Sequence, residues 1–164
     1  MKTKLTTLAL ILLFVISIAI ETQALSFNKL PIKHSSKQWS VEVAEPGHGK
    51  ELVKSEKGKF NTYSLEIHNI GKDVKSVEVF MYRNEPNSTT KYSLFGCPDG
   101  EDCTEGRVEH ANFLAKQLNK GIPYRFENFP LAHKATELEV EIIWTQKGKK
   151  IGRPLKETFT FAVE

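Results

Sequence analysis

The sequence predicts an all-β protein: a single antiparallel β-sandwich of about seven or eight strands behind an N-terminal signal peptide. Three observations support this fold class. Apolar and polar residues alternate in several short runs, turn-forming residues separate these runs, and no run keeps a helical period of 3.6 residues. Such a pattern is typical of a sandwich or a barrel. The chain of 164 residues is long enough for one domain with a real core.

Residues 1–24 have the three parts of a secretory signal peptide. Lys2 and Lys4 precede an apolar run from Leu5 to Ile20, and small residues ending at Ala24 stand where a signal peptidase cuts. The apolar run is shorter than the roughly 20 residues that span a bilayer. We therefore expect cleavage after Ala24 and a secreted or cell-envelope-associated, extracytoplasmic protein. The alternative is an uncleaved segment that anchors the protein in the membrane.

The rest of the chain divides into an N-terminal lead-in segment, residues 25–38, and a β-sandwich domain, residues 39–164. The lead-in segment contains Pro31 and shows no period. The segment 112–118 fits a helix poorly and a strand imperfectly, and we interpret it as a strand. The last two strands form a hairpin in which Trp144 points into the core. Strands are expected at 39–43, 63–68, 74–82, 91–95, 112–118, 124–129, 138–145 and 155–163.

Two stretches carry a family resemblance. Tyr63–Lys72 followed by Val77–Phe80 resembles the early strands of bacterial secreted immunoglobulin-like and fibronectin-III-like domains, and Leu138–Trp144 with Phe159–Phe161 is similar to their last two strands. The resemblance implies an immunoglobulin-like β-sandwich and leaves the function open. Antibody-type domains join their sheets through a Cys…Trp…Cys signature. Here both cysteines lie in one loop, so that subtype is not expected.

Cys97 and Cys103 enclose a short loop that also contains Pro98 and Gly100. Paired thiols normally oxidise outside the cytoplasm, and Pro and Gly favour a tight reversal of the chain. We therefore predict a local disulfide between Cys97 and Cys103 that pins this loop. A redox pair would more usually have C-x-x-C spacing, and no His stands at the spacing of a zinc site.

The sequence contains no catalytic signature and implies no cofactor. Neither H-E-x-x-H nor G-x-S-x-G occurs, so we expect no metal and no enzyme activity, although the five scattered histidines could still converge in the folded chain. Glu139 and Glu141 alternate on one strand face, as on a solvated sheet. Cleavage removes two lysines and Glu21, which lowers the formal charge from +3 to +2. A nearly balanced chain gives no electrostatic case for a nucleic-acid partner.

The candidate binding residues surround the cysteine loop. Tyr92 and Phe95 precede it, and Asp99, Glu101 and Asp102 lie within it. A loop that a disulfide holds loses little entropy when it binds a partner. The alternative is that the disulfide only orders an exposed turn.

A second candidate surface is aromatic. Phe80 and Tyr82 alternate with Val77, Val79 and Met81, and therefore point to the opposite face of their strand. Together with Tyr92 and Phe95 they would form an interaction patch if all four shared an exposed face. The alternatives are that a loop covers them or that the strand is buried on both faces.

We favour a secreted, non-enzymatic β-sandwich that binds a protein or a cell-envelope component. One alternative function is an inhibitor or regulator of an extracytoplasmic enzyme, presenting the loop between Cys97 and Cys103. Another is an enzyme or metal carrier whose site is assembled from distant residues.

Overall fold

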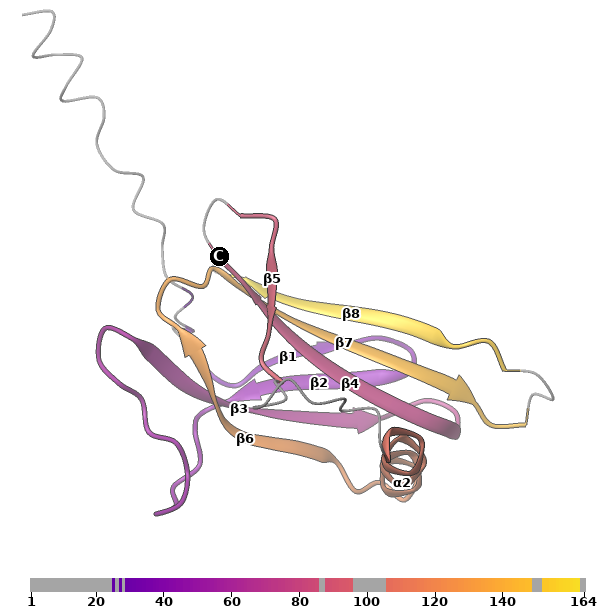
Figure 1. Ribbon diagram of the computed structural model, residues 1–164. Helices are drawn as coiled ribbons and strands as arrows, with labels where there is room; N and C mark the ends of the chain where they lie inside the picture. Colours follow the sequence, from indigo (N-terminus) through magenta and orange to yellow (C-terminus); the bar gives the residue numbers. More distant parts are fainter. Residues whose placement is uncertain are drawn as a thin grey trace, which may run out of the picture.

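Two four-stranded antiparallel sheets face each other and confirm the predicted all-β sandwich (Figure 1). The computed structural model describes residues 25, 27, 29–85, 88–95, 106–148 and 152–162. Every described pair of neighbouring strands is antiparallel.

The first sheet, called sheet A, has the strand order β1-β2-β3-β6. Its strands are β1 (Ile32–Ser35), β2 (Trp39–Ala44), β3 (Phe60–Asn69) and β6 (Tyr124–Ala132). Strand β1 lies inside the segment that the sequence assigned to a lead-in, and it pairs with β2 along its whole length. Leu25 is also buried in the core. The sandwich therefore includes part of residues 25–38 and does not begin at residue 39.

The second sheet, called sheet B, has the strand order β5-β4-β7-β8. Its strands are β4 (Val74–Asn84), β5 (Lys91–Ser93), β7 (Glu137–Gln146) and β8 (Leu155–Ala162). The expected closing hairpin is present, with Val140 opposite Phe159 and Leu138 opposite Phe161. Strand β8 is an edge of this sheet, because only β7 pairs with it.

The core lies between the two sheets and is built from the alternating positions of their strands. Leu138, Val140, Ile142 and Trp144 are all buried along β7, as the sequence predicts. Trp144 meets Trp39 of sheet A edge to face, with ring centroids 5.5 Å apart. Two large aromatic side chains therefore join the layers, and such pairs favour this edge-to-face geometry.

The predicted strand at 112–118 is wrong, because Arg107–Asn119 forms the helix α2. The buried side chains of α2 recur at helical spacing, and two of them are alanines, which a search for large apolar residues overlooks. Val108 and Phe113, which are large and apolar, are 69% and 59% exposed. The buried stripe consists of Ala111, Leu114, Ala115 and Leu118.

Helix α2 lies next to the first residues of β4 and β6, at one side of the sandwich (Figure 1). Its last residue, Asn119, fixes this position through β4. The Val74 N–H donates to Asn119 Oδ1 over 3.0 Å, and Asn119 Nδ2 donates to the Val74 carbonyl over 2.8 Å. The helix thereby closes the sandwich between the two sheets.

Candidate functional site

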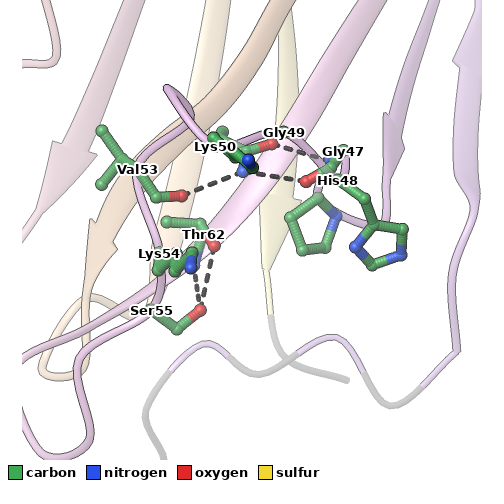
Figure 2. A pocket seen from close by; sticks show the side chains of 10 residues that line it. Gly47, His48, Gly49, Lys50, Val53, Lys54, Ser55 and Thr62 are labelled. Carbon is green, nitrogen blue, oxygen red and sulfur yellow. Dashed lines mark hydrogen bonds between the residues drawn. The ribbon is translucent and has the colours of Figure 1, made fainter.

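A pocket lies where the connection from β2 to β3 folds back on sheet A (Figure 2). Its volume is about 520 Å³. Most of its lining comes from the connecting loop, and one residue each comes from β3 and β6. The lining residues are Pro46, Gly47, His48, Gly49, Lys50, Val53, Lys54, Ser55, Thr62 and Asn128.

A β-bulge places Asn128 under this loop. Tyr63 pairs with Phe129 and Leu65 pairs with Phe126, so Glu127 and Asn128 together lie opposite one residue of β3. Asn128 has a positive φ of 53°, in the left-handed region that Asn tolerates better than most residues. Bulges re-aim side chains, and they are frequent beside functional sites.

The Asn128 side chain holds the loop through three hydrogen bonds. Its Oδ1 accepts from the Gly47 N–H over 2.7 Å, and its Nδ2 donates to the carbonyls of Gly47 at 3.1 Å and Val53 at 2.9 Å. Asn128 is only 4% exposed. Buried hydrogen bonds of this kind fix both ends of the segment between Gly47 and Val53, which has no strand partner of its own.

Two further features shape the pocket. The hydroxyl groups of Ser55 and Thr62 are 2.9 Å apart, and the Thr62 N–H donates to Ser55 Oγ over 3.0 Å (Figure 2). Gly47 and Gly49 let the loop close on Leu52, since a Cβ on either glycine would lie 3.2 Å from Leu52 Cδ1. The absence of a side chain at these two glycines lets the backbone lie close to the Leu52 side chain.

The rim of the pocket is basic. His48, Lys50 and Lys54 are exposed, and no Asp or Glu belongs to the lining. Among the residues that the structure describes, neither lysine forms an ion pair. The two lysines therefore have no ion-pair partner within the lining, and the Glu127 carboxylate lies just outside it, with Oε2 3.9 Å from the position that a Cβ on Gly47 would take.

The binding residues named from the sequence lie elsewhere. Tyr92 is 40% exposed on β5, where the Arg83 guanidinium lies 4.9 Å from its ring centroid. Phe95 is half-buried and packs on Phe126 of sheet A, with ring centroids 5.0 Å apart. Cys97, Asp99, Glu101, Asp102 and Cys103 lie outside the described residues, and their disulfide and binding role stay predictions.

The four aromatic residues proposed as a patch do not share one face. Tyr92 pairs with Arg83 and lies on its side of sheet B, whereas Phe80 and Tyr82 occupy the opposite face. Burial and the neighbouring carboxylates of Glu141 and Glu139 raise the pKa of the Tyr82 hydroxyl. Because the outer face also carries paired charges around its two aromatics, no continuous aromatic surface forms there.

The five histidines are spread over the molecule. They lie on β1, in the pocket loop, on β3, on α2 and after β6. His34 stacks on Phe161 at 4.5 Å between centroids, and His68 Nε2 lies 2.6 Å from Glu66 Oε1. In the described part of the chain, no three His, Cys, Asp or Glu residues come together in a geometry that suits a metal ion.

No binding site is predicted from the sequence at residues 46–55, although these residues carry a signal. Basic residues beside two closely spaced glycines are a feature of loops that bind ligands through backbone and charge. The contribution of Asn128, which is 81 residues distant from Gly47 in the chain, has no local signal.

The fold and the pocket define a class: an all-β sandwich with a pocket formed by a loop at one sheet. Within the described residues, no helix has the length and apolar character needed to cross a membrane. The family described as YozF-like secreted protein matches residues 23–164, so the chain belongs to this family. The predicted extracytoplasmic location is thereby confirmed.

A relative from Bacillus subtilis (strain 168), named Uncharacterized protein YozF, is similar to the chain. The two are 51% identical over 141 residues, which cover 86% of this chain and 84% of the relative. No solved structure matches the chain.

Proposed function

We propose that the protein is a secreted, non-enzymatic binding module whose pocket recognises a component of the cell envelope. The observation that carries this proposal is the support of the pocket by Asn128. A buried side chain with a positive φ of 53° makes three hydrogen bonds to an irregular loop.

The physical advantage of this arrangement is preorganisation. A loop that is fixed before binding loses less conformational entropy when a ligand arrives, and the retained entropy appears as affinity. Rigid sandwiches commonly carry their recognition residues on such loops. The exposed positions of His48, Lys50 and Lys54 leave their side chains accessible to a large ligand.

We also propose that the sandwich is immunoglobulin-like. In immunoglobulin folds, strands A, B and E share one sheet and strands C, F and G share the other. If β2, β3 and β6 are A, B and E, then β4, β7 and β8 take the places of C, F and G. The β1 strand and helix α2 would be additions to this plan.

The binding role is tested by sedimentation with cell walls from Bacillus subtilis (strain 168), the organism of the relative. The exported protein should sediment with the walls, and Asn128→Ala should reduce the bound fraction at least about tenfold because the pocket loses its support. Val53→Trp fills the pocket from a position that is 48% exposed, so it tests the same surface without disturbing the core.

Tyr92→Ala is the matched control, because it removes the exposed aromatic of the other candidate site. It should leave sedimentation unchanged. Loss of binding in Tyr92→Ala with full binding in Val53→Trp would place the ligand at β5 and refute the pocket. If the wild-type protein stays in the supernatant, the cell-wall ligand itself is refuted.

A further inference from the structure

The ligand chemistry of the pocket follows from its charge. Three basic side chains, those of His48, Lys50 and Lys54, belong to the lining, and no carboxylate does. On the outer face of sheet B, by contrast, Lys91 and Lys156 each bind glutamates of β7. Lysines in the lining of a hollow, without a carboxylate in that lining, favour an anionic ligand.

The cations of the lining are of a type that commonly binds phosphate. Both strong cations in the lining are lysines, and no arginine is present. A lysine acts as a compact point charge with three freely rotating donors. Lysine is a common partner of phosphate groups, which it contacts in this way.

The size of the pocket indicates a ligand larger than a bare ion. A volume of about 520 Å³ falls within the range of roughly 300–1,000 Å³ that is usual for small-molecule sites. Pro46 and Val53 add apolar surface to the lining, and the Ser55 and Thr62 hydroxyls add acceptors. A phosphate joined to a polyhydroxylated carbon skeleton would use the charged, polar and apolar parts together.

From these observations we infer that the pocket binds a phosphate group carried on a sugar or polyol, and that Lys50 and Lys54 supply its charge contacts. This inference rests on the proposed binding function and specifies its ligand class. Such a phosphate occurs in free phosphorylated polyols and in envelope polymers linked by phosphodiesters. Both sources present the same chemical group to the two lysines.

The first arm of the test uses sn-glycerol 3-phosphate as the probe. Its addition should shift the backbone amide NMR signals of Gly47, Gly49 and Lys50, while glycerol and acetate should not. Lys50→Gln/Lys54→Gln should weaken the affinity at least about tenfold, since each change removes a hydrogen bond to a charged group. The shifts should also diminish as salt is added, because the rim is exposed to solvent.

The matched control is Lys72→Gln/Lys75→Gln, which removes the same charge from two exposed lysines outside the pocket. Its affinity should equal that of the wild-type protein. An equal loss in both double variants would show a general charge effect and overturn the site. If acetate shifts the amide signals as much as sn-glycerol 3-phosphate does, the pocket does not select phosphate. If inorganic phosphate binds as tightly as sn-glycerol 3-phosphate, the pocket does not recognise the sugar or polyol.

The second arm distinguishes a free phosphorylated polyol from an envelope polymer as the ligand. It also tests the phosphate ligand separately from the proposed binding to the cell envelope. Cell walls are treated with hydrofluoric acid, which cleaves phosphodiesters, before sedimentation with the protein. Loss of binding after treatment supports a phosphodiester polymer as the source. Undiminished binding to treated walls keeps the binding function and overturns the phosphate ligand. Binding of glycerol phosphate without any binding to walls supports the phosphate pocket and refutes the envelope function.

Discussion

In the described part of the chain, cationic side chains are paired with carboxylates on the outer face of sheet B, whereas those in the pocket lining are not. On sheet B, Arg107 binds Glu78, Lys156 binds Glu141 over 2.8 Å, and Lys91 binds Glu137 and Glu139. At the pocket, Lys50 and Lys54 share the lining with no carboxylate. One region neutralises its charges within the fold, and the other leaves them available to a ligand.

The strand arrangement explains the pairing on sheet B. Lys156 of β8 lies diagonally across from Glu141 of the neighbouring β7. Lys91 of the edge strand β5 reaches across β4 to Glu137 and Glu139 of β7.

Residues 45–55 have no strand partner, and their geometry depends on Asn128. Lys59 and Glu56 of the same connection do pair outside the strands, so the unpaired lysines are a feature of the pocket lining itself. Substitutions in each region test this contrast.

The largest effect is expected from Asn128→Ala. Removal of three buried hydrogen bonds leaves the Val53 carbonyl and the Gly47 amide without their partner, and the free energy of unfolding should fall by about 2–3 kcal/mol. Urea unfolding followed by tryptophan fluorescence measures this change. Asn128→Gly loses the same bonds but accepts the positive φ, so it should be about 1 kcal/mol more stable than Asn128→Ala.

A loss below about 1 kcal/mol in both variants would contradict the role of Asn128, because it would show that the loop keeps its position without these bonds. The contrast between the pocket and sheet B would then lack its structural basis.

Glu157 provides a test beneath the paired face of sheet B. It alternates with the buried Phe159 and Phe161 and thus points inward, and its Oε2 is buried without a hydrogen-bond partner among the described residues. Because an unpaired buried polar atom is destabilising, Glu157→Ile should raise the free energy of unfolding by about 1 kcal/mol. Glu157→Gln keeps a polar group there and should give no such gain.

The same residue is expected to keep the protein from associating through the edge of sheet B. Strand β8 is a sheet edge, and an inward-pointing charge is one of the features that discourage edge-to-edge pairing. Size-exclusion chromatography should show concentration-dependent association of Glu157→Ile and not of Glu157→Gln. A monomeric Glu157→Ile at all concentrations would show that this charge does not protect the edge.

A smaller effect is expected from breaking a surface pair. The Glu141 side chain is 15% exposed and that of its partner Lys156 is 58% exposed, so Glu141→Gln should cost about 0.5 kcal/mol. Lys54→Gln removes a charge that has no partner in the described chain and should leave thermal unfolding unchanged. Equal destabilisation by the two substitutions would contradict the distinction between paired and unpaired cations.

The sequence predicts much of the sheet structure and little of the pocket. Alternation identified β7 and its inward Trp144 because a strand shows its two faces in the residue order. Helix α2 is not predicted because two residues of its buried stripe, Ala111 and Ala115, are small and contribute little to an apolar pattern. The pocket depends on a bulge in β6 and on Asn128, and such long-range pairing leaves no periodic pattern in either segment.

The smallest effect is expected at Glu66, on the outer face of sheet A. It tests whether charged side chains are paired on the strands of both sheets or only on those of sheet B. Burial favours a higher pKa for this carboxyl, but hydrogen bonds from Arg125, at 2.7 Å, and His68 outweigh burial and lower the pKa. A carboxyl with a lowered folded-state pKa stabilises the protein above its ordinary pKa of 4.5, and that stabilisation is lost as pH falls through the folded-state pKa.

Since Arg125 is 62% exposed, the contribution should be only about 0.2–0.5 kcal/mol. Urea unfolding at pH 7 should show Glu66→Gln and Arg125→Gln destabilised by similar amounts, and the difference from the wild type should shrink as the pH falls below 4.5. The double variant should lose no more than either single variant. Additive losses that persist at low pH would show that the pair does not interact, and that regular strands of sheet A do not neutralise their charges as those of sheet B do.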